Sequence, residues 1–157
     1  MQWSEMLADR TLADLPYKIE QDRWGNIVMS PSSNRHGRLQ VVLAALFEHL
    51  PQGQALIECS IATAEGVKVA DVAWGSQAFF DRHGYTTPYP QAPELCVEIR
   101  SPSNSMEEME WKSRLYLAAG ACEVWVVSEE GGVRYFGTDG ELASSRFDID
   151  PAPLLGH

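Results

Sequence analysis

The sequence predicts one α/β domain in which a mixed β-sheet is flanked by helices. A strand–helix–strand pattern spans residues 95–127, and such a unit places two parallel strands in one sheet with the helix packed on its face. Two hairpin patterns precede it, at 17–29 and 55–74, and supply antiparallel strands. The length of 157 residues is typical of one domain. We therefore expect residues 1–157 to form a single domain.

The first third of the chain predicts a short helix, a hairpin and a long helix. Residues 4–13 begin with a capping serine and have an apolar side, which favours a helix. Two β-rich runs follow, at 17–21 and 27–29, with a glycine-containing turn between them. Apolar residues at helical spacing then predict a helix over 36–50, which a Pro-Gln-Gly sequence ends.

The middle of the chain predicts a second antiparallel pair. The runs 55–63 and 67–74 are rich in β-branched residues and are joined by Ala-Glu-Gly. A short helix is expected over 76–83. The segment 84–93 contains three prolines and is expected to be a loop.

The last third supplies the parallel strands. Residues 95–100 form a short strand, and 106–119 form a helix that a glycine ends. The continuous apolar run 124–127 is typical of a strand buried on both faces. A Gly-Gly turn then leads into a strand at 133–136. Residues 141–157 show no clear period, which predicts coil with at most one edge strand.

The charge balance limits the kind of partner. The net charge is −10 and the sequence pI is about 4.7. Neutralised phosphates supply most of the affinity of proteins for nucleic acid backbones. The whole chain is therefore unsuited to tight, non-specific DNA binding. A local basic cleft, or a metal ion that supplies the positive charge, stays compatible with DNA as a partner.

Other sequence features exclude several classes of protein. No stretch is apolar for long enough to cross a bilayer, and the first residues do not resemble a signal peptide, so we expect no membrane partner and a cytoplasmic location. Cys59, Cys96 and Cys122 are odd in number and widely spaced, which argues against disulfides and a thiolate zinc site. We expect Cys96 and Cys122 to be small buried hydrophobes. Gly-rich phosphate loops and HExxH motifs are absent from the sequence.

Two acids interrupt apolar strands. Asp71 lies within Val-Ala-Asp-Val-Ala, and Glu98 lies within Leu-Cys-Val-Glu-Ile. An acid in such a strand is costly to bury unless it is paired or binds a metal. Either acid alone could equally alternate outward to water. Two such acids on neighbouring strands favour a functional site.

Three further residues are weaker candidates. Lys112 lies in the predicted helix beside Tyr116 and other apolar neighbours, so its amine could reach an acid, although a lone lysine there more often extends to solvent. Glu20 lies in the first hairpin and on its own is more simply an exposed strand acid. His36 begins the long helix and is more simply a surface or capping histidine.

The block 93–105, Pro-Glu-Leu-Cys-Val-Glu-Ile-Arg-Ser-Pro-Ser-Asn-Ser, resembles the Uma2 family of restriction endonucleases, a branch of the PD-(D/E)XK nuclease superfamily. In that family an apolar strand ends in Glu and is followed by Ser-Pro-Ser-Asp/Asn, a helix with Lys and Tyr, and an apolar strand with Trp. Here the continuation is Lys112, Tyr116 and 123–127. The resemblance spans about 15–137 and implies a restriction-endonuclease-like fold.

Upstream, Val-Ala-Asp71-Val-Ala is similar to the family's Pro-Asp strand. Glu20, the Met-Ser-Pro run and His36 are similar to its N-terminal signature. Two departures stand out. Ala70 replaces the proline, which carries no chemistry, and Arg100 replaces the superfamily's lysine two residues after Glu98. Guanidinium stays protonated and cannot act as a base, so the resemblance implies that Lys112 is the functional amine. Arg100 is left to contact phosphate or to serve the structure.

The resemblance implies a metal-dependent nuclease that hydrolyses phosphodiester bonds in DNA. Mg²⁺ or Mn²⁺ would be held by Asp71, Glu98 and a strand carbonyl such as that of Ile99. Lys112 would orient the attacking water or stabilise charge, and Glu20 would add a ligand or position the metal's water shell. A homodimer is expected if the protein cuts both strands. The alternatives are a catalytically degraded nuclease fold that serves as a binding or assembly module, which the acidic charge favours, and a nuclease that acts only within a larger complex.

Overall fold

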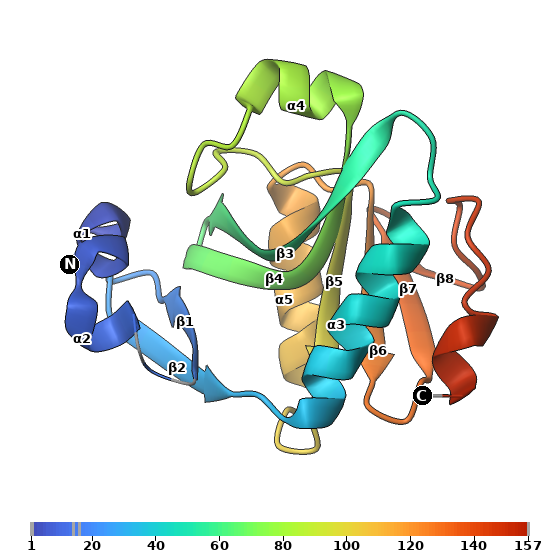
Figure 1. Ribbon diagram of the computed structural model, residues 1–157, viewed down its shortest axis with the longest axis horizontal. Coiled ribbons are helices and arrows are strands. Elements are labelled where there is room, and N and C mark those ends of the chain that lie inside the picture. Colours follow the sequence, from blue (N-terminus) through green and yellow to red (C-terminus); the bar gives the residue numbers. More distant parts are fainter. Residues whose placement is uncertain (1, 14, 16, 157) are drawn as a thin grey trace.

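A six-stranded mixed sheet forms the centre of the computed structural model, which describes residues 2–13, 15 and 17–156. The strands are β3 (Gly53–Thr63), β4 (Gly66–Ser76), β5 (Leu95–Arg100), β6 (Glu123–Ser128), β7 (Val133–Gly137) and β8 (Gly140–Leu142). They lie side by side in chain order (Figure 1). The pair β5–β6 is parallel and the other neighbours are antiparallel. The predicted mixed sheet is therefore confirmed.

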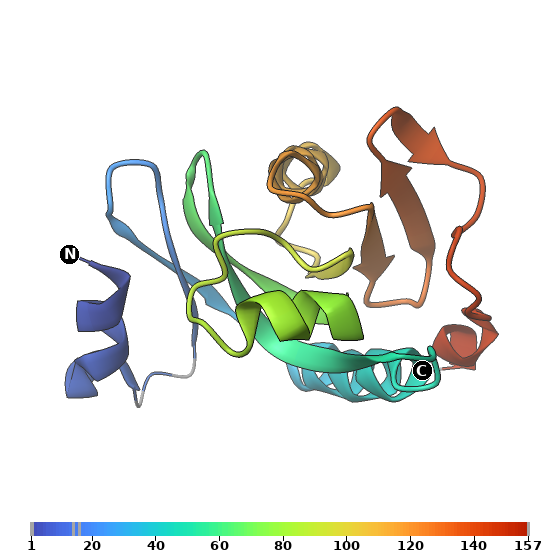
Figure 2. The same ribbon diagram turned by 90° about the horizontal axis from the view of Figure 1, so that it is seen from above.

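Helices cover both faces of this sheet (Figure 2). Helix α3 (Asn34–Phe47) packs on one face, where its Leu39, Leu43 and Phe47 meet the side chains of alternate β4, β5 and β6 residues. Helices α4 (Gln77–His83) and α5 (Met106–Ala118) pack on the other face with a second apolar cluster. Strand β5 is thus buried on both sides, and its residues alternate between the two clusters.

The first helices of the chain differ from the predicted ones. The expected helix over 4–13 is two helices, α1 (Trp3–Ala8) and α2 (Arg10–Ala13), because Asp9 has extended backbone angles. The Asp9 carboxylate accepts a hydrogen bond from the Thr11 N–H at 2.9 Å. This bond closes a local turn, which competes with a continuous helix. The long helix α3 begins at Asn34, two residues earlier than expected, since Ser33 caps it.

The end of the chain is more ordered than its pattern predicted. Part of the segment 141–157 adds the short edge strand β8, and the rest ends in a 3₁₀ helix, η1 (Ala152–Gly156). Buried Glu123 holds the segment that leads to this helix, because its carboxylate accepts a hydrogen bond from the Arg146 N–H. It also accepts one from the indole of Trp125 on its own strand. Cys96 is buried as expected, whereas Cys122 is exposed, so the expectation of a buried Cys122 is wrong.

A separate two-stranded hairpin, β1 (Tyr17–Gln21) and β2 (Ile27–Pro31), packs against β4. The Lys68 ammonium donates to the carbonyl of Gln21 at 2.9 Å. Gly66 lies so near the hairpin turn that a Cβ there would be 2.2 Å from the Asp22 carbonyl oxygen, and its φ is +91°. Only glycine fits such a close approach at that angle. These contacts bring Lys18 and Glu20 of β1 against the middle of β4.

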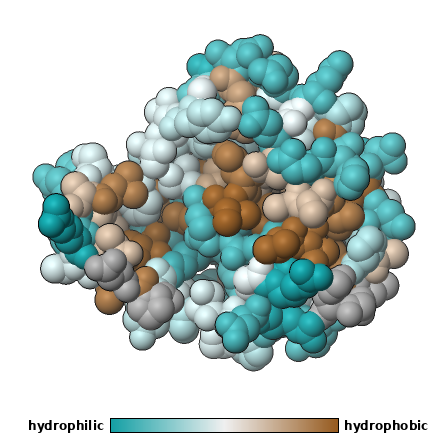
Figure 3. Space-filling model, viewed as in Figure 1, coloured by the Kyte–Doolittle hydropathy of each residue, from teal (hydrophilic) through white to brown (hydrophobic). Residues whose placement is uncertain are grey.

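The surface seen in Figure 3 carries apolar residues over its middle, the region that α3 occupies in Figure 1. Val41 on α3 is 60% exposed and Ile57 on β3 is 54% exposed. Among the described residues, no helix combines the length and the apolar character needed to cross a membrane.

Candidate active site

The site lies where β4 and β5 separate. Their ladder consists of Val72–Val97, Ala73–Cys96 and Trp74–Leu95. One further step in this register would place Asp71 opposite Glu98, and there the ladder ends. Instead, the Asp71 carboxylate accepts the Ile99 N–H at 2.7 Å. A carboxylate therefore takes the place of a backbone acceptor at the fork between the two strands.

Glu20 also supplies a carboxylate acceptor for a backbone N–H, in this case one of β4. Its Oε2 accepts the Val69 N–H of β4 at 2.7 Å, across the interface with the hairpin. Glu20, Asp71 and Glu98 are 4%, 1% and 2% exposed. The two strand acids thus share one site, as their positions on neighbouring strands predicted. Glu20 is buried with them, so the simpler expectation of an exposed strand acid is wrong.

Lys112 of α5 reaches this cluster from one face of the sheet. Its Nζ lies 2.8 and 2.9 Å from the two oxygens of Glu20 and 3.3 Å from Oε1 of Glu98. Lys112 is buried with Met109 and Tyr116, which share its helix face, so it does not extend to solvent. The Tyr116 hydroxyl donates to Oε1 of Glu98 at 2.6 Å.

Two residues complete the cluster that the sequence had not placed in it. The Lys18 ammonium lies 3.1 Å from Oδ1 of Asp71 and 3.1 Å from Oε2 of Glu98. Nε2 of His36 lies 3.1 Å from the same Oδ1 of Asp71. His36 is 7% exposed, which corrects the expectation of a surface or capping histidine. The sequence signal for Lys18 is its place two residues before Glu20 in a predicted strand. This spacing shows only that both side chains lie on the same side of β1.

The burial of these charges shifts their pKa values. Burial raises the pKa of Glu98 above its usual range, despite the nearby ammonium groups of Lys112 and Lys18. Asp71 differs: although burial opposes ionisation, Lys18, His36 and the Ile99 N–H hold its pKa well below the usual range. Burial likewise opposes charge on Lys18, yet the carboxylates of Asp71, Glu98 and Glu20 raise its pKa well above the usual range. The cluster therefore stabilises an ammonium and a carboxylate at neutral pH.

A small cavity opens onto the cluster. Its volume is about 30 Å³, and it is lined by Lys18, His36, Asp71, Glu98 and Lys112. Residues 30–32, at the end of β2 and the start of the next loop, and Ser101 and Asn104 of a second loop also line it. A space of this size can hold a water molecule or an ion. The loops place serine hydroxyls and the Asn104 amide at its edge. Arg100 donates from Nε to the Asn104 carbonyl at 2.9 Å and so holds the second loop.

The carboxylates at this cavity have the chemistry that suits a hard divalent cation, but in this structure they are taken up in ion pairs. As the side chains stand, no three His, Cys, Asp or Glu residues in the described part of the chain are arranged as metal ligands. The Lys18 ammonium lies between two of the acids, each within 3.1 Å. Asp71 and Glu98 therefore already converge on one positive centre, and carboxylate oxygens are the ligands that Mg²⁺ and Mn²⁺ prefer.

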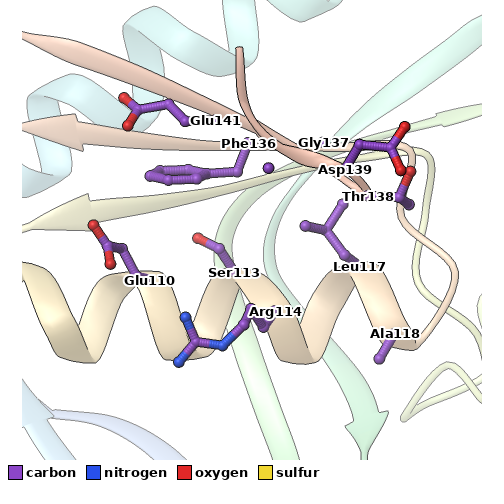
Figure 4. Close-up of a pocket in the computed structure, with 11 residues that line it drawn as sticks. Glu110, Ser113, Arg114, Leu117, Ala118, Phe136, Gly137, Thr138, Asp139 and Glu141 are labelled. Carbon is purple, nitrogen blue, oxygen red and sulfur yellow. The ribbon is translucent and has the colours of Figure 1, made fainter.

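A larger cavity of about 690 Å³ lies elsewhere, between α5 and the β7–β8 hairpin (Figure 4). It is lined by Glu110, Arg114, Leu117, Phe136 and Asp139 among others, and by none of the clustered acids or lysines. By size alone, this cavity would be the candidate binding site. The buried ionised groups lie at the smaller one, and perturbed charges of this kind are typical of functional sites.

Comparisons with known proteins agree with this architecture. The model of the Uma2 family, described as "Putative restriction endonuclease", matches residues 13–150. One solved structure with the same fold is that of a "putative nuclease belonging to DUF820" from Anabaena variabilis ATCC 29413. It aligns with a TM-score of 0.72 at 16% sequence identity and covers 88% of this chain and 89% of the other. The comparison with curated proteins finds no match.

The pKa of Asp71 predicts how stability depends on pH. Because its folded-state pKa lies below the unfolded value, Asp71 contributes stability above pH 3.8 that is lost as the pH falls towards the folded value. We expect Asp71→Asn to reduce the slope of unfolding free energy against pH between pH 4 and 2, by up to about 1.4 kcal/mol per pH unit. Urea denaturation at each pH measures this, with Asp139→Asn, at an exposed position, as the control. Parallel curves for wild type and Asp71→Asn would contradict the assignment.

Proposed function

We propose that this chain, which belongs to the Uma2 family described as "Putative restriction endonuclease", is a metal-dependent endonuclease that hydrolyses phosphodiester bonds in DNA. The observation that carries the proposal is the convergence of Asp71 and Glu98 on one cationic centre, with the Lys112 ammonium 3.3 Å from Glu98. Phosphodiester hydrolysis needs negative charge on the phosphoryl oxygens neutralised and a water molecule activated.

Mg²⁺ or Mn²⁺ would be held by the carboxylates of Asp71 and Glu98 and the carbonyl oxygen of Ile99. When bound, such an ion polarises the phosphate and makes a coordinated water more acidic. The protein orients the carboxylates that would bind it. The Ile99 N–H holds one oxygen of Asp71, and the Tyr116 hydroxyl holds one oxygen of Glu98. In each case the other carboxylate oxygen is the one that faces Lys18.

Lys112 is the proposed functional amine. Glu20 binds it through both carboxylate oxygens and so fixes the direction of its stem. From this place Lys112 would orient the attacking water or stabilise the charge that develops on the phosphate. Glu20 would in addition position the water shell of the ion. Arg100 has no such role in the proposal, because its guanidinium holds the loop that carries Asn104.

DNA is the proposed substrate, and it contacts the protein around the small cavity at the charged cluster. With a net charge of −10, the chain as a whole is unsuited to holding a phosphate backbone. Residues 30–32, at the end of β2 and the start of the next loop, border the site together with Ser101 and Asn104, and they present serine hydroxyls and an amide. Such groups contact phosphate oxygens without adding net charge.

The second candidate function is a catalytically degraded nuclease fold that serves as a binding or assembly module. What favours it is the pairing within the cluster, since each of the three carboxylates already has an ammonium within 3.3 Å. A site neutralised in this way is stable without a metal ion. Cleavage and gel-shift assays on a panel of DNA and RNA substrates, with and without Mn²⁺, separate the two candidates: binding without cleavage supports the module.

We propose further that the protein acts as a homodimer, because cutting both strands of a duplex needs two sites. Val41 of α3 and Ile57 of β3 are exposed apolar side chains. Figure 3 shows apolar surface gathered over the middle of the face it displays, and such a patch commonly marks an interface. Sedimentation of the wild type and of Val41→Asp tests the proposal. A dimer that the substitution weakens is expected, and a monomer in both samples at micromolar concentration contradicts it.

The central test of the function removes each proposed metal ligand. We expect Asp71→Asn and Glu98→Gln each to lower Mn²⁺-dependent cleavage by at least about a hundredfold, because each loses a charged ligand while keeping its shape. Glu141→Gln, an exposed acid of β8 outside the cluster, is the control and should cut like the wild type. Cleavage by either site variant at the wild-type rate would refute the mechanism.

A separate substitution tests the role of Lys112. We expect Lys112→Met to lower the single-turnover rate by about a hundredfold. The dissociation constant for Mn²⁺, measured by calorimetry, should stay within about threefold of the wild-type value, because Lys112 is not a metal ligand. Loss of Mn²⁺ binding with an unchanged turnover would show the opposite, a lysine that organises the metal site and takes no part in the reaction.

A further inference from the structure

Lys18 is the buried lysine of the cluster that the proposed reaction does not use. Its side chain is 10% exposed, and its Nζ lies 3.1 Å from both Oδ1 of Asp71 and Oε2 of Glu98. Oε2 of Glu20 is more distant, at 3.9 Å. Lys18 thus neutralises the same two acids that would hold the divalent ion, whereas Lys112 is bound chiefly to Glu20.

The ammonium and a divalent ion cannot share these two oxygens. Mg²⁺ lies about 2.1 Å from each oxygen ligand. An ion bound to Oδ1 of Asp71 and Oε2 of Glu98 would therefore be at most about 5 Å from Nζ of Lys18. Both groups are positive, and the buried surroundings screen their repulsion weakly. An ion coordinated by these two oxygens takes over both of the short contacts of the Lys18 ammonium, so the two cations compete for one position.

The structure offers a place for the displaced side chain. Lys18 also lines a second cavity, of about 410 Å³, whose other lining residues include Tyr17, Glu58 and Ser60. Glu58 is exposed and accepts a hydrogen bond from Gln40, so its carboxylate could receive the ammonium. β1 pairs with β2 in a sheet separate from the central one, and rotation of the Lys18 side chain breaks no ladder hydrogen bond.

We propose that Lys18 is an internal competitor of the divalent cation. It occupies the cation position between Asp71 and Glu98 in the metal-free protein, and metal binding drives its ammonium into the cavity beside Glu58. This inference rests on the proposed function for the identity of the ion. It assigns to this chain a built-in limit on metal affinity, set by a residue that is neither a metal ligand nor part of the reaction.

Calorimetric titration of Mn²⁺ into wild type, Lys18→Met and Arg134→Met tests the competition. We expect Lys18→Met to bind Mn²⁺ at least about tenfold more tightly than the wild type, because no ammonium opposes the ion. Arg134 is the control: it is a cation outside the cluster, and its guanidinium pairs with Glu110 and Glu141. Its substitution should change the affinity by less than about threefold, well below the change expected for Lys18→Met.

A second measurement uses the wild-type protein and does not depend on how a variant folds. Amine acetylation followed by mass spectrometry measures the accessibility of Lys18. We expect saturating Mn²⁺ to increase the labelling of Lys18 several-fold, while the labelling of Lys68 stays constant as an internal reference.

The outcomes separate this inference from the proposed function. Equal Mn²⁺ affinity in wild type and Lys18→Met, with unchanged labelling of Lys18, overturns the competition and leaves the metal site intact. If Mn²⁺ binds to Lys18→Met and not to the wild type, the Lys18 ammonium excludes the ion completely, which supports the competition. Absence of Mn²⁺ binding in both proteins overturns the competition together with the metal site on which the nuclease proposal depends.

Discussion

Three carboxylates are buried at the point where β4 and β5 part, and this concentration of negative charge governs the rest of the site. Each ion removed from water carries a penalty of several kcal/mol unless opposite charges and hydrogen bonds compensate it. Glu20, Asp71 and Glu98 obtain that compensation from Lys18, Lys112 and two backbone N–H groups. The fork between the strands is what makes those N–H groups available, because the β4–β5 ladder has ended.

The same constraint explains how distant segments are brought together. The hairpin supplies Lys18 and Glu20, the central strands supply Asp71 and Glu98, and α5 supplies Lys112. No one of these elements can be displaced without leaving a charge unpaired in the interior, which is far more costly than losing a surface ion pair. A fold held in this way keeps its charged groups fixed, as an enzyme needs. The same fold also keeps the Lys18 ammonium between Asp71 and Glu98 when no metal is bound.

The sequence predicted the fold class and most of its elements, because those depend on local patterns. The strand acids were identifiable since Asp71 and Glu98 interrupt apolar runs, and the resemblance to the Uma2 family added Lys112 and Glu20. Lys18 and His36 could not be placed in the site in the same way. Each looks like an ordinary polar residue near the start of its element, and its acid partner is separated from it by more than thirty residues in the chain. The bend at Asp9 and the 3₁₀ helix at the end of the chain were missed because short side-chain turns leave no periodic signal.

The central claim is that Asp71 and Glu98 hold a divalent cation beside Lys112. Diffraction from a crystal soaked in Mn²⁺, recorded at a wavelength where manganese scatters anomalously, tests it most directly. The account predicts one strong anomalous peak within about 2.2 Å of oxygens from both Asp71 and Glu98. A fully soaked crystal with no peak there, or with manganese bound only at another site, would contradict it.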